Sequence, residues 1–254
     1  MKQHWNPDLY NTKHAFVYKY GESLVELLNP GKQERILDLG CGSGQLTAKI
    51  GDLAMEVIGL DKSHAMISDA KLKFHHIEFQ VGDASDFCFE EKFDAIFSNA
   101  TLHWVTNYRE CIRCMFNNLK SGGRIVVEFG GKGNVQIIVN QLRASLAAYG
   151  YPNQSKLQLW HFPSIGEYSS LLEQAGFRVT IAQHYDRPTE LSDGNTGIKD
   201  WLSMFGEQFF QGIDPEHVDK IKSDVQEKIK PKALLNEKWY ADYKRLRIMA
   251  IKEE

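Results

Sequence analysis

A glycine-rich stretch near residue 40 constrains this chain more than any other feature. Residues 36–47 read I-L-D-L-G-C-G-S-G-Q-L-T. Residues 34–39 predict a short buried strand, three glycines follow at alternate positions, and residues 45–50 predict the start of a helix. Glycine suits such a turn because it adopts positive φ and lets a ligand lie directly on the backbone. A strand, a glycine-rich turn and a helix N-terminus together form a nucleotide-type cofactor site.

The spacing of the glycines and the acid before them restrict which cofactor can bind. Gly40, Gly42 and Gly44 give G-x-G-x-G, whereas dinucleotide enzymes carry G-x-G-x-x-G. Asp38 stands at the strand end, where its carboxylate would repel a pyrophosphate. A cofactor that carries an ammonium and a sulfonium would meet no such repulsion. The alternative is a glycine turn in an unrelated α/β protein.

A second acid ends the next predicted strand, residues 56–61. Asp61 lies roughly 20 residues past the first glycine, the spacing at which an acid reaches the ribose hydroxyls of a nucleotide cofactor. The alternative is that Asp61 caps the following helix. Because Ser63 can serve as that cap, Asp61 is free to bind ribose.

A third acid follows the predicted strand of residues 77–81. Asp83 stands in a Gly-Asp-Ala turn, where aspartate is common for reasons of local structure alone. In sequence with Asp38 and Asp61, however, it favours a role in cofactor binding. The three acids would then lie at the ends of three successive strands.

Three sequence runs resemble class I S-adenosylmethionine-dependent methyltransferases. The D-L-G-x-G-x-G run resembles motif I of that class. The F-D-x-I-x-S-N-x-x-L-H-W-V run of residues 93–105 and the F-P-S-x-x-E-Y-x-x-L-L-E-x-A-G-F run of residues 162–177 resemble the trans-aconitate and malonyl-carrier-protein methyltransferase group. The N-P-P-Y type of segment, which methyltransferases of nucleic-acid and protein amino groups carry, is missing after residue 98.

The resemblance implies a doubly wound α/β fold, with a seven-stranded Rossmann-like sheet whose last strand is antiparallel. It also implies S-adenosylmethionine as the cofactor. Met66 would pack on the adenine, although a methionine there is also typical of a core. The cofactor-binding residues that we expect on this basis are Asp38, Gly40, Cys41, Gly42, Gly44, Asp61, Lys62, Met66, Asp83, Ala84 and Asn99.

Fewer residues indicate the methyl acceptor. His103 is the candidate catalytic residue, either as a base or in contact with substrate, and a structural histidine paired with backbone is the alternative. Arg187 is a candidate clamp for a carboxylate, unless it is an ordinary loop arginine. The expected substrate-binding residues are Trp5, Tyr10, His103, Trp104, Arg187 and Trp201.

Composition and patterning favour one soluble domain over residues 1–254. Residues 1–30 predict an N-terminal cap helix, with Trp5 and Tyr10 either frayed or folded over the cofactor, and residues 186–242 predict a helical lid inserted in the domain. The net charge of −3 indicates no phosphate-binding surface, so we expect no nucleic-acid partner. With no leader and no long apolar run, we expect a cytoplasmic monomer without a membrane partner.

The four cysteines do not predict a metal site. Cys111 and Cys114 have C-x-x-C spacing, but no second pair or nearby histidine pair completes a zinc site. An apolar helical stripe beside them predicts buried thiols instead. We therefore expect no metal.

The sequence thus predicts an S-adenosylmethionine-dependent methyltransferase acting on a small molecule, with O-methylation of a carboxylate as the most specific expectation. Two alternatives stay open. One is a nicotinamide-dependent oxidoreductase of Rossmann type, and the other is a protein that binds S-adenosylmethionine without catalysis.

Overall fold

The structure, a computed structural model, describes residues 16–191 and 195–253, with side chains from residue 21 on. Within these residues the chain divides into two units. The sheet unit holds the chain up to Lys132, then Trp160–Tyr185 and the chain from Arg245 on. The helical unit holds Gly133–Leu159 and Asp186–Lys244.

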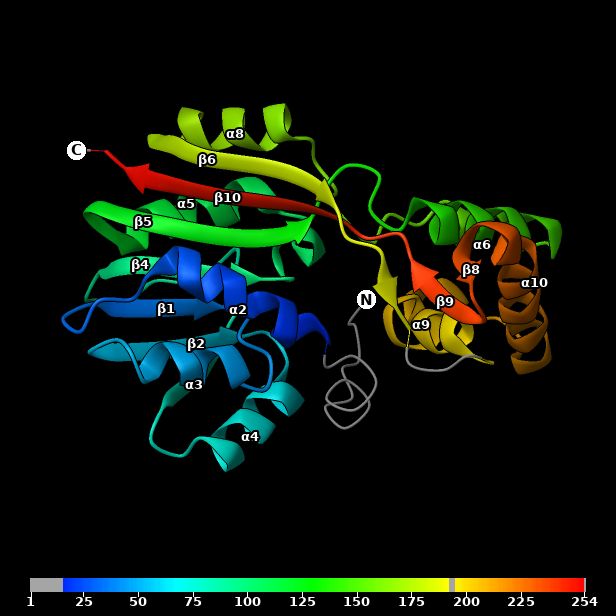
Figure 1. Ribbon diagram of the computed structural model, residues 1–254, viewed down its shortest axis with the longest axis horizontal. Helices are drawn as coiled ribbons and strands as arrows, with labels where there is room; N and C mark the ends of the chain where they lie inside the picture. Colours follow the sequence, from blue (N-terminus) through cyan, green and yellow to red (C-terminus); the bar gives the residue numbers. More distant parts are fainter. Residues whose placement is uncertain (1–15, 192–194, 254) are drawn as a thin grey trace. The chain divides into compact units, whose positions relative to one another are not determined.

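One sheet of seven strands organises the sheet unit (Figure 1). Strands β1 to β5 pair in parallel, whereas β10 is antiparallel to β5. This confirms the predicted doubly wound sheet with an antiparallel last strand. In spatial order the strands are β3 (Glu78–Val81), β2 (Glu56–Asp61), β1 (Arg35–Leu39), β4 (Phe93–Asn99), β5 (Leu119–Gly130), β10 (Lys244–Lys252) and β6 (Phe177–Asp186).

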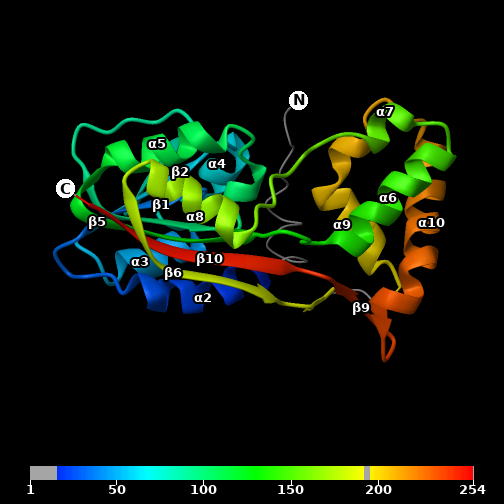
Figure 2. The same cartoon turned by 90° about the horizontal axis from the view of Figure 1, so that it is seen from above.

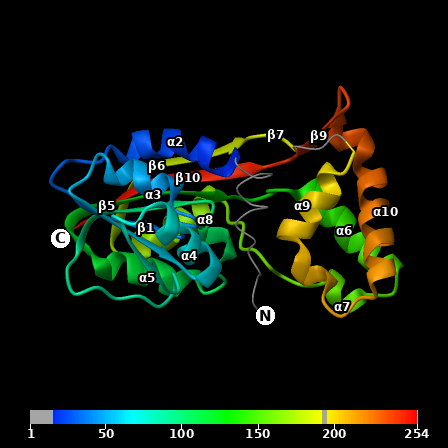
Figure 3. The same cartoon turned by 90° about the horizontal axis from the view of Figure 1, so that it is seen from below.

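Helices cover both faces of this sheet, which is why its central strands are apolar along their whole length. Figures 2 and 3 show α2 (Phe16–Leu28) and α3 (Gln45–Gly51) on one side of the strands. Helices α5 (Tyr108–Asn118) and α8 (Ile165–Gln174) lie on the other side. Helix α4 (His64–Lys73) packs against β3 at the edge.

Successive residues of a strand contribute to different sides of the core, as strand geometry requires. Ile36 of β1 packs with Leu24 of α2 and Ile50 of α3. Its neighbour Leu37 packs with residues of α5 and α8, among them Met115 and Leu172. The S-x-x-E spacing of Ser164 and Glu167 predicts a capping box, and this capping box forms the start of α8.

The sequence predicts strands over residues 124–129 and 177–181, and the structure differs from this prediction at one boundary of each strand. Strand β5 starts at Leu119, five residues before the expected Arg124, so Gly122 and Gly123 lie inside the strand and not in a loop. Strand β6 continues to Asp186 instead of ending at Ile181. In β5 the pairing with β4 shifts register between Leu119 and Arg124, so residues 120–123 form an irregular stretch within the strand.

Helices and a small sheet make up the helical unit (Figure 3). Helix α6 packs along α10, although the two are far apart in sequence. The helices expected in residues 186–242 are present. The three short strands are an addition, since they are too brief for a periodic pattern. The elements are α6 (Gln136–Ala148), α7 (Pro152–Ser155), β7 (Thr189–Glu190), α9 (Gly197–Phe205), η2 (Glu207–Phe210), α10 (Pro215–Ala233), β8 (Leu234–Leu235) and β9 (Lys238–Ala241).

Three further observations bear on the expectations from sequence. Cys111 and Cys114 are buried, as predicted. No group of three or more His, Cys, Asp and Glu side chains that could hold a metal occurs among the described residues. In the same part of the chain, no helix is both long and apolar enough to cross a membrane.

Candidate active site

The glycine loop joins β1 to α3 at the carboxyl edge of the sheet, where open α/β sheets bind their ligands. The backbone N–H groups of Gly40 and Cys41 donate to the carbonyl of Leu60 at 2.6 and 3.1 Å, which fixes the loop to β2. Gly40, Gly42 and Gly44 have φ values of 80°, 55° and 87°. All three lie in the left-handed region that favours glycine.

The three glycines differ in what surrounds them. A Cβ at Gly40 would lie 2.1 Å from Oγ1 of Thr101, and one at Gly44 would lie 2.8 Å from the ring of Phe79. A Cβ at Gly42 would meet nothing within 4 Å. Gly40 and Gly44 are therefore needed for packing, whereas Gly42 leaves open space in which a ligand can approach the backbone.

Asp38 is the most deeply buried of the three predicted acids. Only 2% of it is exposed, and one carboxylate oxygen accepts a hydrogen bond of 2.6 Å from the hydroxyl of Thr47. Burial raises the pKa of Asp38 to about 7, with the Thr47 hydrogen bond opposing this and the charge of Asp61 adding to it. A cationic ligand group at this strand end would stabilise the ionised carboxylate.

Asp61 holds the glycine loop and the start of α4 together. Its Oδ2 accepts from the N–H of Gly42 at 3.0 Å, and its Oδ1 accepts from the N–H of Ser63 at 2.8 Å. Ser63 is the cap of α4, since its hydroxyl accepts from the N–H of Met66. Burial raises the pKa of Asp61, and the backbone hydrogen bonds oppose that shift. Each oxygen retains a second lone pair, so the carboxylate can also accept from ribose hydroxyls.

Asp83 lies in a more open setting after β3. Its two oxygens accept from Nζ of Lys62 at 2.6 Å and from the N–H and hydroxyl of Ser85 at 2.9 and 2.8 Å. These hydrogen bonds outweigh the effect of burial and hold the pKa of Asp83 below its usual value. Asp83 is thus ionised at neutral pH, as an acceptor from an adenine amino group must be.

The backbone is strained where β4 ends. Ala100 has a φ of 57°, a conformation that non-glycine residues rarely adopt and that clusters at functional sites. Its N–H donates to the carbonyl of Glu128 at 2.7 Å. The turn places Asn99 at the end of β4, and the Thr101 hydroxyl against the carbonyl of Gly40 at 3.1 Å. This end of β4 is therefore bound to the glycine loop.

His103 lies in the short helix η1 (Leu102–Trp104) that follows. It is 7% exposed, and its Nδ1 accepts a hydrogen bond of 3.3 Å from the N–H of Gly130. An Nδ1 that accepts leaves the proton of the neutral ring on Nε2. Burial, and then the charge of Arg245, hold the pKa of His103 well below its usual value. The ring is neutral at pH 7, with Nε2–H as its hydrogen-bond donor.

Aromatic rings surround His103. Its ring is tilted against those of Trp104 and Phe162, with centroids 5.5 and 5.6 Å apart. Trp160 meets Trp104 edge-on at 5.5 Å and stacks on Phe162 at 5.8 Å. The segment of residues 160–162, which sequence reasoning did not assign to the site, therefore completes an aromatic wall around His103.

The remaining predicted acceptor residues lie elsewhere in the chain. Trp5 and Tyr10 are outside the described residues. Trp201 is buried in the helical unit, where its Nε1–H donates to the hydroxyl of Tyr243 at 2.8 Å. The backbone N–H of Arg187 donates to the carbonyl of Tyr243 at 2.8 Å, also in the helical unit. Contact of these residues with an acceptor stays a prediction.

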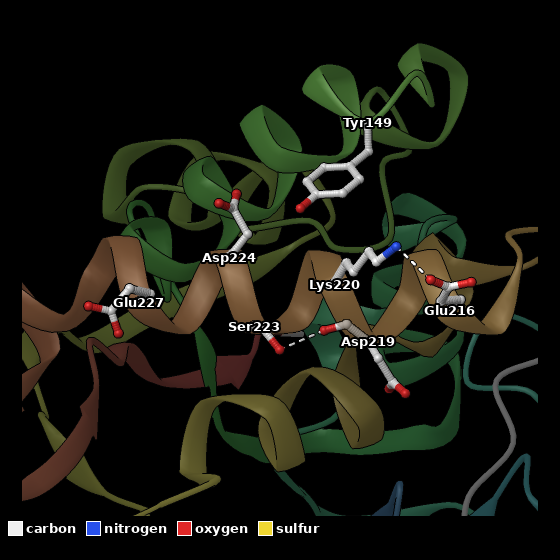
Figure 4. A pocket seen from close by; sticks show the side chains of 7 residues that line it. All are labelled: Tyr149, Glu216, Asp219, Lys220, Ser223, Asp224 and Glu227. Carbon is white, nitrogen blue, oxygen red and sulfur yellow. Dashed lines mark hydrogen bonds and ion pairs between the residues drawn. The ribbon is translucent and has the colours of Figure 1, made fainter.

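The helical unit has an open groove along α10, with a volume of about 530 Å³ (Figure 4). Within it Lys220 pairs with Glu216 at 2.6 Å. No predicted site residue lines the groove, so the candidate site stays at the carboxyl edge of the sheet. Its lining residues are Tyr149, Glu216, Asp219, Lys220, Ser223, Asp224 and Glu227.

The residues at the carboxyl edge fit S-adenosylmethionine. Asp38 and the open side of Gly42 suit the cationic amino-acid end, Asp61 suits the ribose, and Asp83 suits the adenine amino group. Asn99 ends the strand between the glycine loop and η1. Roles for Cys41, Lys62, Met66 and Ala84 stay predictions; of these, Met66 and Ala84 are buried.

Two hydroxyl residues that shape this edge escaped the sequence reasoning. Thr47 donates to Asp38, and Thr101 fills the space beside Gly40. A threonine in the first turn of the helix after the glycines was a usable signal for Thr47. The sequence offered no signal for Thr101, because its role depends on how closely two loops approach.

Comparisons with known proteins agree with this geometry. The family described as a methyltransferase domain matches residues 30–176. An uncharacterized methyltransferase of Schizosaccharomyces pombe is 32% identical over 263 residues, covering 99% of each chain. A trans-aconitate 2-methyltransferase of Methylobacterium radiotolerans is 30% identical over 229 residues, covering 84% of each chain.

Solved structures resemble the fold at low sequence identity. The YcgJ protein of Bacillus subtilis has a TM-score of 0.65 at 16% identity, covering 93% of this chain and 99% of that one. An N-methyltransferase of Haemonchus contortus, solved with S-adenosylhomocysteine, has a TM-score of 0.57 at 16% identity, covering 93% of this chain and 53% of that one.

The family match removes the nicotinamide oxidoreductase from the alternatives. It spans the glycine loop and all three strand-end acids, the features from which the cofactor was predicted. The chain therefore belongs to the methyltransferase domain family and is an S-adenosylmethionine-dependent methyltransferase.

Proposed function

We propose that this methyltransferase acts on a small carboxylic acid and converts one carboxylate into a methyl ester. The observation that carries the proposal is the hydrogen bond from the Gly130 N–H to Nδ1 of His103. It occupies the ring nitrogen that would otherwise accept a proton. The name of the trans-aconitate 2-methyltransferases among the relatives gives further support.

A carboxylic acid fits a site without a base. Its pKa lies near 4, so it is already ionised at neutral pH and no proton has to be removed. When bound, S-adenosylmethionine supplies the methyl group: a carboxylate oxygen bonds to the methyl carbon, the carbon–sulfur bond breaks with its electron pair left on sulfur, and the products are a methyl ester and S-adenosylhomocysteine.

The protein's own residues would then act by position and by exclusion of water. The strained turn at Ala100 and the bond between Thr101 and Gly40 fix η1 relative to the glycine loop. The ring of His103, neutral and held by Gly130, presents a donor to an anionic acceptor. The aromatic residues around it exclude water, which strengthens each polar contact with the acceptor.

Methyl transfer to a panel of aliphatic di- and tricarboxylic acids, trans-aconitate among them, tests the proposal. The expected product gains one methyl group by mass spectrometry and loses it again in mild alkali, as an ester does. The maximal rate should be flat from pH 6 to 8. At saturating acceptor, His103→Ala should lower kcat by less than about tenfold, since general-base catalysis, worth 10²–10⁴-fold, is not in use.

Two results would contradict the proposal. One is a methylated product that resists alkali, which indicates transfer to nitrogen or carbon. The other is a rate that climbs through a pKa near 6.5 and collapses in His103→Ala, which makes His103 a base. A cytoplasmic location and a monomeric state stay predictions from the sequence, and so does closure of residues 1–10 and 186–242 over the acceptor.

A further inference from the structure

Thr47 of α3 directs its hydroxyl to a strand and not to its own helix. It lies in the first turn of α3 and is fully buried, and its Oγ1 donates to Oδ2 of Asp38 in β1 at 2.6 Å. The hydroxyls of Ser68, Ser203 and Ser223, in α4, α9 and α10, instead donate to the carbonyl four residues earlier, a common partner for a hydroxyl in a helix. Thr47 therefore makes a tertiary contact behind the glycine loop.

The carboxylate of Asp38 is supported by this hydroxyl and not by a cation. Asp38 is 2% exposed, and among the described residues no lysine, arginine or histidine pairs with it. A cation already in place would compete with the ammonium group of a ligand for the same carboxylate. A hydroxyl stabilises the ionised carboxylate through a hydrogen bond without neutralising its charge. Thr47 thus leaves Asp38 negative toward a ligand.

The titratable groups around Asp38 do not take the place of Thr47. Asp61 of β2 adds a like charge. Burial, and then the charges of the two aspartates, raise the pKa of the Cys41 thiol in the glycine loop, so this thiol stays neutral. Lys49 of α3 pairs with Glu22 of α2. The residues that pair with Asp38 in β2 and β4 do not titrate.

We propose that Thr47 is a positioning residue of the cofactor site: its hydroxyl holds Asp38 in the orientation and charge state in which the carboxylate accepts the ammonium group of S-adenosylmethionine. This rests on the fit of Asp38 to the amino-acid end of the cofactor, and not on the proposed acceptor. Burial raises the pKa of Asp38 to about 7, and the Thr47 hydrogen bond keeps it from lying higher. The hydroxyl therefore sets the pH below which affinity for the cofactor falls.

Calorimetry with S-adenosylhomocysteine at pH 6, 7 and 8 tests the proposal, because this product keeps the amino-acid end of the cofactor. Thr47→Val keeps the shape of the side chain without the hydroxyl. Loss of a charged hydrogen bond should move the pKa of Asp38 up by about one pH unit. The variant should then bind about tenfold more weakly than wild type at pH 6, and within about twofold of wild type at pH 8. Thr47→Ser restores the hydroxyl and should recover the wild-type profile.

Ser98→Ala is the matched control. Ser98 of β4 is also fully buried, and its hydroxyl donates to the carbonyl of Leu39 in β1 at 2.7 Å. This variant loses a buried hydrogen bond to the same strand without touching a carboxylate. It should lower the melting temperature, and the ratio of its dissociation constant to that of wild type should be the same at all three pH values.

Two results would overturn the role of Thr47. One is a Thr47→Val variant whose ratio to wild type is the same at pH 6 and pH 8, since the hydroxyl then only supports the loop; if this variant does not fold, Thr47→Ala decides by the same measurement. The other is an Asp38→Asn variant with wild-type affinity, which removes the carboxylate through which Thr47 acts. Neither result involves an acceptor, so the panel of acids judges the proposed function separately.

Discussion

Three aspartates at neighbouring strand ends have different environments and therefore different ionisation. Asp38 is buried, and its pKa is raised to about 7. Asp83 is more open, and Lys62 and Ser85 hold its pKa down. A cationic ligand group would favour the charged form of Asp38, whereas Asp83 is already charged. Cofactor binding should thus be coupled to proton release at Asp38 and not at Asp83.

Asp38→Asn should alter how stability depends on pH. The folded pKa of Asp38 is about 7, and an unfolded aspartate titrates near 4. Between these values the folded state binds more protons, so stability falls as pH rises. Asparagine does not titrate, so the free energy of unfolding of the variant should not fall in this way. Between pH 5 and pH 8 the difference between variant and wild type should therefore shift in favour of the variant, by on the order of a few kcal/mol. Urea unfolding of the ligand-free proteins measures it.

Asp83→Asn is the control for this experiment. The pKa of Asp83 is lowered, so its contribution is present above the unfolded value near 4 and is lost only as pH falls below that. The difference in free energy of unfolding between Asp83→Asn and wild type should therefore be constant from pH 5 to 8. If Asp38→Asn also shows a constant difference, Asp38 is ionised in the folded protein throughout this range.

Asp61→Ala should weaken binding of S-adenosylhomocysteine by tenfold or more, because a charged hydrogen bond contributes about 1.5–3 kcal/mol. It should also lower the melting temperature, since the N–H groups of Gly42 and Ser63 lose their acceptor. Asp61→Asn keeps one acceptor oxygen and should lie between Ala and wild type. Calorimetry that gives the same dissociation constant for all three would reduce Asp61 to a support for the loop.

The sequence indicated which residues are candidates for binding and catalysis, but not which contacts they make. The L-H-W-V run singled out His103, yet the bond that fixes its tautomer comes from Gly130, a residue 27 positions away. Arg187 was preferred as a clamp because it lies at the end of a predicted strand.

At the scale of elements, the glycine loop combines two functions in three residues. Gly40 and Gly44 let Thr101 and Phe79 approach, whereas Gly42 opens onto free space. The pattern G-x-G-x-G predicted the turn correctly. It could not separate packing from ligand approach, because that distinction depends on residues 35 to 61 positions further along the chain.

Gly42→Ala should therefore affect the cofactor more than the fold. Its methyl group meets nothing within 4 Å, so the cost to stability is the strain at a φ of 55°, about 1–2 kcal/mol. The same methyl occupies the space facing the ligand, and S-adenosylhomocysteine affinity should fall more than tenfold. In Gly40→Ala, by contrast, overlap with Thr101 should lower stability strongly. Paired calorimetry and urea unfolding test both, and a Gly42→Ala variant with wild-type affinity would place the cofactor away from this loop.

Element boundaries were predicted less well than element types. Lys120 to Gly123 lack strand formers, yet they belong to β5, where the pairing with β4 shifts register between Leu119 and Arg124. Asn134 precedes an apolar helical pattern, and asparagine is a typical cap residue, so the sequence predicts that it caps α6. Instead its side chain accepts from the N–H of Lys244, and the cap position is Val135 at a φ of 48°. Local sequence cannot reveal a competing partner 110 residues away.

At the scale of the whole molecule, the order of strands differs from their order in the chain. Strand β10 comes after every other strand of the large sheet in sequence, but it lies between β5 and β6. The helical unit likewise joins two separate stretches: Ser145 of α6 donates to Asp224 of α10 at 2.6 Å. Sequence patterns found the helices of both stretches but not that they meet.

A chain that ends at Tyr243 should fail to fold cooperatively. It lacks β10, so β5 and β6 lose the strand that joins them, and the buried Leu246, Ile248 and Ala250 leave the core. A chain that ends at Lys252 is the control. It loses the exposed pair of Glu253 with Arg178, worth up to about 1 kcal/mol, and the hydrogen bond from the Glu253 N–H to the carbonyl of Gly176. Thermal unfolding followed by circular dichroism compares them; a sharp transition in the shorter chain would show that β10 is dispensable.

The place of β10 between β5 and β6 has a consequence for biosynthesis. In a growing polypeptide, β5 leaves the ribosome with the backbone N–H and C=O groups of one edge unpaired, and β6 follows with no strand beside it. Both strands stay unpaired on this side until the second stretch of the helical unit, Asp186–Lys244, has been made. Open strand edges invite pairing with other chains. Translation that stalls before residue 244 would thus leave a nascent chain with no strand between β5 and β6, and their unpaired edges would stay exposed until β10 is made.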